Sequence, residues 1–135
     1  MLSCPAAEFS GFVLTESGRS VGYFLMAQLG RQARLVDFQI TGQQDSAERF
    51  RALRSLFSAV TRTASQDKKI AELVVGTSDD KIGGMLVEIG FRLRRQDEIL
   101  YYDPRKLLEA GTQLNLNLID SDLSFLYNPA RPYIS

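Results

Sequence analysis

The chain has 135 residues, of which 44% are hydrophobic and 24% charged, and 16 basic and 16 acidic side chains give a formal net charge of zero. This composition is typical of one globular domain and excludes a disordered chain. The lack of excess positive charge argues against binding to nucleic acid and against binding to anionic membranes.

The chain has no histidine and a single cysteine, Cys4. Without histidine, the Ser/His and Cys/His nucleophile systems are excluded, and no metal site is predicted. One cysteine cannot form an intramolecular disulfide, which favours a reducing compartment, so a cytoplasmic location is expected. We expect neither a signal peptide nor a membrane span, because no apolar run approaches the ~20 residues that cross a bilayer.

The first forty residues predict three strands joined by tight connections. An apolar stretch at residues 9–14 leads through a Ser-Gly turn to residues 21–29, which carry apolar side chains on both faces and predict a central strand in a hairpin. Residues 30–34 are expected to form a second tight connection, and residues 35–40 the third strand. Val36, Phe38 and Ile40 are expected on one face of that strand, with Asp37 and Gln39 on the other.

Two helices are predicted in the middle of the chain. Asp45 is the expected N-cap of the first, with Glu48 three positions later in a capping-box pattern. Its apolar stripe is expected to comprise Phe50, Leu53, Phe57, Val60 and Ala64. A buried strand follows at residues 70–76. The polar side chains at residues 77–80 then cap a shorter helix with Ile82, Met85, Leu86 and Ile89 on its apolar face. Gly90 occupies the C′ position, where glycine adopts a left-handed conformation at low cost.

Two further strands are predicted at residues 91–95 and 98–102. The expected class is therefore α+β, with a mixed, mostly antiparallel sheet and two main helices. Residues 1–103 form the core, and residues 104–135 form a C-terminal extension of the same domain. Alternating leucines at positions 114, 116 and 118 predict an edge strand in that extension.

The order of these elements, together with the segment Asp80-Lys-Ile-Gly-Gly-Met-Leu-Val-Glu-Ile-Gly-Phe91, resembles the GCN5-related N-acetyltransferase (GNAT) superfamily. The likeness covers roughly residues 11–103, the core and C-terminal half of the family's fold. The first strand of the family and the two helices that follow it, which help form the acceptor-substrate site, have no counterpart in this sequence. The resemblance implies a cosubstrate, acetyl-CoA or another acyl-CoA.

The resemblance places the acyl-CoA site between the strand at residues 35–40 and the strand at residues 72–76. Pantetheine would pair with the backbone of Phe38, Gln39 and Ile40, and the pyrophosphate would rest on the next helix N-terminus, where amides and the helix dipole favour an anion. The phosphate motif of the family maps onto Gln44, Ala47 and Arg49. Ala47 and Arg49 stand at the two glycine positions of that motif, and Asp45 and Glu48 add negative charge.

The resemblance also suggests catalytic positions. Asp37 matches, by strand position, the carboxylate that some members use as general base, acting through water, and amides near residues 38–40 would polarise the thioester carbonyl. A solvated strand face is the alternative interpretation of Asp37. Leu86 stands where the family often has a tyrosine as general acid, so the usual route for protonating the leaving thiolate is missing.

The sequence leaves two function classes open. One is an acyl-CoA-dependent N-acyltransferase-like domain whose catalytic competence is in doubt. The other is a non-catalytic GNAT-like domain that acts in oligomerisation or interaction, with the apolar segment at residues 114–127 pairing with a second copy of the chain or with the missing half of a longer one. A small-ligand binding module that uses the same cleft is a third hypothesis.

Overall fold

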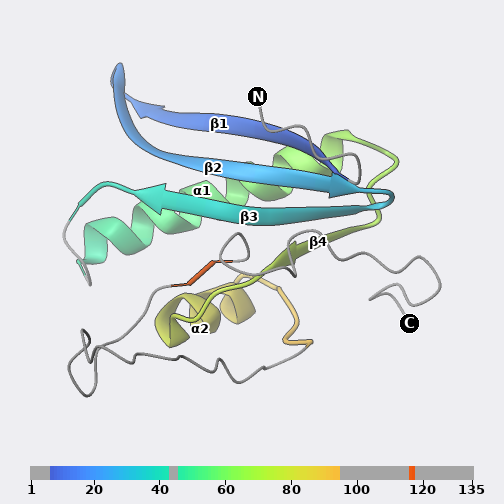
Figure 1. Cartoon of the computed structure of the whole chain (residues 1–135). Coiled ribbons are helices and arrows are strands. Elements are labelled where there is room, and N and C mark those ends of the chain that lie inside the picture. The colour runs from blue at the N-terminus through green and yellow to red at the C-terminus, as the bar shows by residue number, and fades with distance from the viewer. Residues whose placement is uncertain (1–6, 43–45, 95–115, 118–135) are drawn as a thin grey trace, which may run out of the picture. The chain divides into compact units, whose positions relative to one another are not determined.

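The computed structural model describes residues 7–42, 46–94 and 116–117 (Figure 1). The chain divides into two compact units, one of Met1–Gly76 with Asn117–Ser135 and the other of Thr77–Leu116. The described residues form a four-stranded mixed sheet and two helices, so the α+β class expected from the sequence is confirmed. The division expected at residue 103, the strand at residues 98–102 and most of the C-terminal extension lie outside the described residues.

The first unit contains the sheet. Its strands are β1 (Glu8–Glu16), β2 (Arg19–Leu29), β3 (Gln32–Ile40) and β4 (Glu72–Val75), in the spatial order β1-β2-β3-β4. The first three strands are antiparallel neighbours, and β4 is parallel to β3. The parallel pair needs a crossover connection, which the helix between β3 and β4 supplies.

Two-residue turns join the antiparallel strands. Ser17 (φ 50°) and Gly18 (φ 78°) both have positive φ, as a type I′ hairpin turn requires. Gly30 (φ 58°) has positive φ at the first position of the second turn, the pattern of type II′. The predicted Ser-Gly hairpin is therefore confirmed. The second connection is shorter than expected, because β3 already begins at Gln32 and includes Arg34.

A register shift between β2 and β3 changes which face Val36 occupies. Leu25 pairs with Asp37 and Met26 with Leu35, so Val36 is an extra residue in β3 without an opposite partner in β2. Val36 packs in a buried cluster with Ala27 and Leu29. The prediction that Val36 shares a face with Phe38 and Ile40 is therefore wrong, because a bulge interrupts the alternation on which it was based.

Helix α1 (Ala47–Gln66) lies against one face of the sheet (Figure 1). Phe38 of β3 contacts Phe57 of α1 edge-on, with ring centroids 5.3 Å apart at 67°. The buried side chains of α1 are Leu53, Leu56, Phe57, Val60 and Ala64. The predicted stripe omitted Leu56 and included Phe50, which is only partly buried.

Ser46, and not the predicted Asp45, caps the N-terminus of α1. The Ser46 hydroxyl accepts a hydrogen bond from the backbone N–H of Arg49 at 3.1 Å. The capping-box prediction was wrong by one residue, since Arg49, rather than Glu48, is three positions after the cap. Asp45 itself lies outside the described residues.

The second unit contains helix α2 (Asp80–Glu88). The Asp79 carboxylate accepts hydrogen bonds from the N–H groups of Lys81 and Ile82, so the predicted cap is confirmed. At the other end Gly90 (φ 105°) donates to the Val87 carbonyl, and Phe91 donates to the Leu86 carbonyl. These two bonds form a Schellman motif, as the glycine predicted.

Residues 91–94 are irregular, so the prediction of a strand at residues 91–95 is wrong over the part that is described. The N–H of Phe91 is already used in closing α2. Leu93 is 74% exposed, and Ile89, expected on the apolar face of the helix, is 38% exposed. An alternating pattern forms a strand only where a partner strand supplies the hydrogen bonds.

Candidate functional site

The Asp37 carboxylate is the centre of a small polar cluster on β3. The Tyr23 hydroxyl donates a hydrogen bond to Oδ2 of Asp37 at 2.7 Å. The Asn117 side-chain amide donates to Oδ1 at 2.9 Å. Each carboxylate oxygen thus accepts a hydrogen bond from a described residue, and Asp37 itself is partly buried. A carboxylate held in this way has a fixed orientation and keeps lone pairs for a further donor.

The strand register explains how Tyr23 reaches Asp37. Asp37 pairs with Leu25, and Tyr23 pairs with Gln39. Tyr23 is therefore the diagonal neighbour of Asp37 on the same face of the sheet, within reach of a long side chain. This face is opposite to the one that Phe38 presents to α1, so the prediction that Asp37 and Phe38 point to opposite faces agrees with the contacts.

Asp37 changes the ionisation of Tyr23. The hydrogen bond to Asp37 raises the pKa of the Tyr23 hydroxyl above its ordinary value, and partial burial and the negative charge of Asp37 raise it further. Tyr23 therefore stays protonated at neutral pH and keeps donating to the carboxylate. The residue Tyr23 is 39% exposed, and its oxygen retains lone pairs that can accept a hydrogen bond from a ligand.

The strand that carries Asp37 extends beyond its parallel neighbour. The pairing of β3 with β4 covers Gln32 to Leu35 on one strand and Glu72 to Val75 on the other. β3 then continues to Ile40, so in the described part of the chain no strand pairs with this side of β3 beyond Leu35. Phe38, Gln39 and Ile40, the predicted cofactor-binding residues, lie on this extension.

The end of β3 is held firmly against β2. The Thr41 N–H and hydroxyl both donate to the Val21 carbonyl, at 2.9 and 3.0 Å. A Cβ on Gly22 would overlap the Gln39 backbone oxygen and lie 2.6 Å from Cδ1 of Ile40. Only glycine therefore allows β2 to approach the end of β3 this closely.

The start of α1 provides the other predicted cofactor-binding residues. Ala47 is the first helical residue and is exposed, whereas Arg49 is partly buried and its N–H is bonded to Ser46. Glu48 adds a negative charge to the first turn. The connection from β3 joins these residues to Asp37 along the chain, and Gln44, within that connection, lies outside the described residues.

A second polar group is buried at the opposite end of β3. Arg34 is 2% exposed and Gln32 is 1% exposed. Gln32 accepts a hydrogen bond from Nε of Arg34 and donates one to Glu72. The Gln32 amide thus connects a buried cation to a carboxylate on β4, as a charge in a low-dielectric interior requires. We interpret this group as structural.

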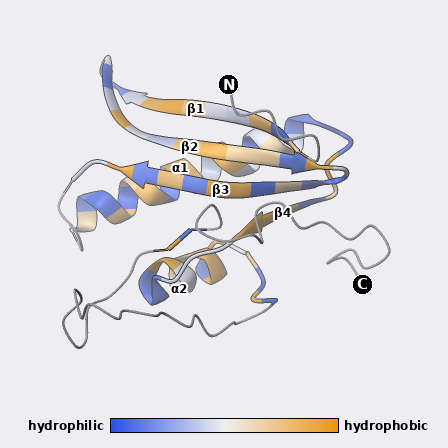
Figure 2. Ribbon diagram, viewed as in Figure 1, coloured by the Kyte–Doolittle hydropathy of each residue, from blue (hydrophilic) through white to orange (hydrophobic). Residues whose placement is uncertain are grey.

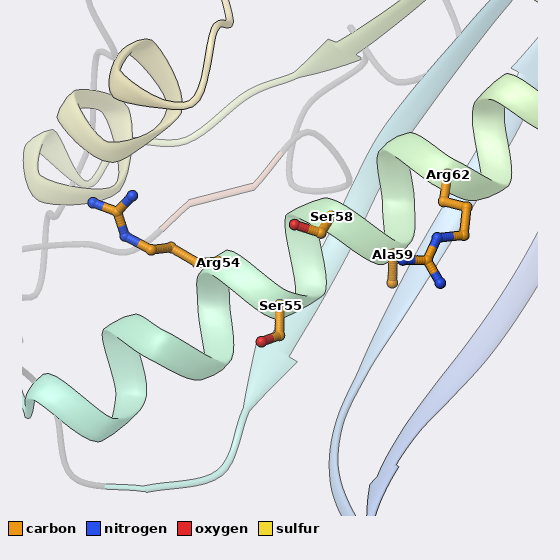
Figure 3. Close-up of a pocket in the computed structure, with 5 residues that line it drawn as sticks. All are labelled: Arg54, Ser55, Ser58, Ala59 and Arg62. Atoms are coloured by element: carbon orange, nitrogen blue, oxygen red, sulfur yellow. The ribbon is translucent and has the colours of Figure 1, made fainter.

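The exposed face of α1 carries a shallow hollow of about 350 Å³. It is lined by Arg54, Ser55, Ser58, Ala59 and Arg62, which come from successive turns of the helix (Figure 3). None of the predicted site residues lines it. Because one helix supplies the whole lining, the hollow lacks the convergent walls of a ligand pocket.

Sequence reasoning missed Tyr23, Asn117 and the burial of Arg34. The hairpin register, which the Ser-Gly turn fixes, is the signal that could have paired Tyr23 with Asp37. Asn117 is 80 residues away from Asp37 in the chain. No local sequence pattern predicts a contact between residues so far apart in the chain.

In residues 7–42, 46–94 and 116–117 no group of three or more Cys, Asp or Glu side chains is arranged to hold a metal ion. No helix in this part of the chain is long and apolar enough to cross a membrane. Comparison with known proteins adds no assignment: no family model, curated protein or solved structure matches this chain.

Proposed function

We propose that this chain is an acyl-CoA-dependent N-acyltransferase-like domain. The observation that carries the proposal is the extension of β3 beyond β4, with a bulge at Val36 where the parallel pairing ends. An extended ligand with amide groups can bind such a strand edge through main-chain hydrogen bonds. The pantetheine arm of CoA has this chemistry.

The helix that follows supports a site for the phosphates. α1 begins seven residues after Ile40, the last paired residue of β3, and a helix N-terminus attracts anions. The backbone N–H of Arg49 already donates to the Ser46 hydroxyl, so this N–H does not bind a phosphate, and the Glu48 carboxylate repels an anion. The Arg49 guanidinium would therefore supply the positive charge that pairs with pyrophosphate.

The cluster around Asp37 fits an amine acceptor. An ammonium group could donate to the free lone pairs of Asp37 and to the Tyr23 oxygen, and Asp37 could then remove a proton through water. The neutral amine would attack the thioester carbon, the C–S bond would break to release the CoA thiolate, and the nitrogen would lose its extra proton to water to give the amide. Leu86 cannot protonate this thiolate, so the catalytic competence of the domain depends on another proton source.

A non-catalytic domain that acts in assembly is the second candidate. The specific observation in its favour is the self-capped start of α1, where Ser46 satisfies an amide that a phosphate would otherwise bind. In either case we place the domain in the cytoplasm, since its single cysteine suits a reducing compartment.

Titration calorimetry with acetyl-CoA distinguishes the two candidates. The proposal expects saturable binding of acetyl-CoA, weakened about tenfold or more in Arg49→Glu, which corresponds to ~1.4 kcal/mol per tenfold. Arg62→Glu is the matched control, because it makes the same charge change on the same helix, about four turns from the N-terminus. Absence of binding at millimolar acetyl-CoA, or equal loss in both variants, would favour the non-catalytic domain.

A further inference from the structure

In the part of the chain that the structure describes, strand β1 is the edge of the sheet, yet both of its faces carry apolar side chains. Phe12 and Leu14 pair with Phe24 and Gly22 and lie on the face covered by α1, while Phe9 and Val13 point to the other face. Apolar residues on both faces are typical of a strand whose two faces are both covered. Figure 2 shows hydrophobic residues on β1 as well as on β2, β3 and β4.

The side chains of β1 are only partly covered. Val13 is 67% exposed, and Phe9, Phe12 and Leu14 are partly buried. Phe12 stacks on Phe24, with ring centroids 4.6 Å apart, and Phe9 packs against the buried cluster around Ala27. Apolar packing on both faces of the sheet therefore extends to β1, where an additional strand would cover the exposed side chains.

β1 lacks the features by which edge strands avoid pairing. It is nine residues long and contains no Lys, Arg or Pro, and its only charges are Glu8 and Glu16 at its two ends. The register shift between β1 and β2 leaves Val21 as an extra residue in β2. The irregularity therefore lies in β2, and β1 keeps a regular alternation. No strand in the described part of the chain pairs with its outer edge. A long and regular edge with charges only at its ends is a template for another strand.

We propose that β1 pairs in an antiparallel manner with β1 of a second copy of this chain, with Val13 opposite Val13 on the two-fold axis. This register also places Phe12 opposite Leu14 on the α1 side, so that three central pairs are apolar. Glu16 then faces Ser10 of the other copy. A register centred on Phe12 would instead place Glu8 opposite Glu16 and Ser10 opposite Leu14, which brings like charges together.

The self-complementarity of these pairs identifies the occupant as a second copy. A two-fold interface requires one segment to match itself in reverse, and β1 does so around Val13. The result is a continuous eight-stranded sheet made from two four-stranded sheets. This dimer uses a different segment from residues 114–127 and does not depend on the acyltransferase proposal.

Sedimentation velocity of the full chain tests the dimer. We expect wild type to sediment as a dimer and Val13→Lys as a monomer, because two lysines would meet on the axis. Val87→Lys is the matched control, since Val87 is also exposed, at 56%, but lies on α2. A monomeric wild type, or a Val13→Lys variant that dimerises as well as Val87→Lys, would overturn the proposal.

Disulfide cross-linking tests the register. In a Cys4→Ser background, Val13→Cys should cross-link to a second copy under mild oxidation, since opposite Cβ atoms in such a pair are about 5 Å apart. Thr15→Cys should not cross-link, because Thr15 lies opposite Gly11 of the other copy. The two cysteines would be four residues apart along the strands, about 14 Å. Equal cross-linking of both variants, or none in Val13→Cys, would exclude this register.

Discussion

Tyr23 donates a hydrogen bond to Asp37 at 2.7 Å, from a neighbouring strand and a diagonal position. Asp37 is thereby held by its own sheet and, through Asn117, by a residue far along the chain. The pair also links structure to pH, because the carboxylate raises the pKa of the hydroxyl.

Tyr23→Phe is expected to change the alkaline stability of the protein. A folded-state pKa above the unfolded value stabilises the fold below the unfolded value of about 10, and this contribution disappears as the pH rises through the folded-state pKa. At neutral pH the variant should lose about 1 kcal/mol of unfolding free energy, and the difference from wild type should shrink above pH ~10. Urea unfolding of both proteins at a series of pH values from neutral to alkaline measures this difference in unfolding free energy.

Asp37→Asn provides the control for this pH effect. It weakens the hydrogen bond that contributes most to the raised pKa of Tyr23 and removes the negative charge that adds to it. The tyrosinate absorbance assigned to Tyr23 should therefore appear at lower pH than in wild type. To assign the absorbance to Tyr23, the titration curve of a Tyr23→Phe variant is subtracted from that of its parent, both for wild type and for Asp37→Asn. An unchanged Tyr23 titration in Asp37→Asn would contradict the pairing.

Two glycine substitutions should have opposite effects. Gly22→Ala places a Cβ against the Gln39 backbone oxygen, which cannot move aside, and should destabilise the fold by about 2 kcal/mol. Gly84→Ala meets nothing within 4 Å on an exposed position of α2 and should stabilise it by up to ~1 kcal/mol. Thermal unfolding of both variants is the measurement, and equal melting temperatures would show that β2 and β3 do not approach this closely.

Ser46→Ala tests the cap of α1. Loss of the hydroxyl leaves the Arg49 N–H without its partner and should cost about 1 kcal/mol. Ser55→Ala is the matched control in the exposed middle of the same helix, where alanine should be neutral or stabilising by up to ~0.5 kcal/mol. Chemical denaturation distinguishes them, and a Ser46→Ala variant as stable as Ser55→Ala would mean that Ser46 is not the cap.

A double-mutant cycle tests the packing of α1 on the sheet. Phe38→Leu and Phe57→Leu each remove one ring of an edge-on pair. The two losses of stability should not add, and the coupling should be about 1 kcal/mol. Strictly additive losses would show that the rings do not interact.

The sequence predicted the elements whose signals are local. The Ser-Gly turn, the cap of α2 and Gly90 at the end of α2 each depend on residues a few positions apart, and all three were confirmed. The apolar stripe of α1 was confirmed except that Leu56 is buried and Phe50 is only partly buried. The cap of α1 was wrong by one residue, because Asp45 and Ser46 are both good caps and the sequence pattern favours the one followed by Glu48.

The failed predictions depended on contacts between distant residues. The alternation at residues 91–94 looked like a strand, but a strand also needs a partner, which no local pattern supplies. The face of Val36 depends on a bulge, which is set by how β2 and β3 align and cannot be read from β3 alone.

The sequence by itself determined the class of the fold, the two helices and the position of Asp37 on a strand, because periodicity and capping act within one element. Only the tertiary structure decided that Tyr23 and Asn117 converge on Asp37 and that β3 extends beyond β4. It also showed that, among the described strands, β1 is an edge although it has apolar residues on both faces. The physical reason is that register and strand order follow from contacts between residues far apart in the chain, whose energies no single segment contains.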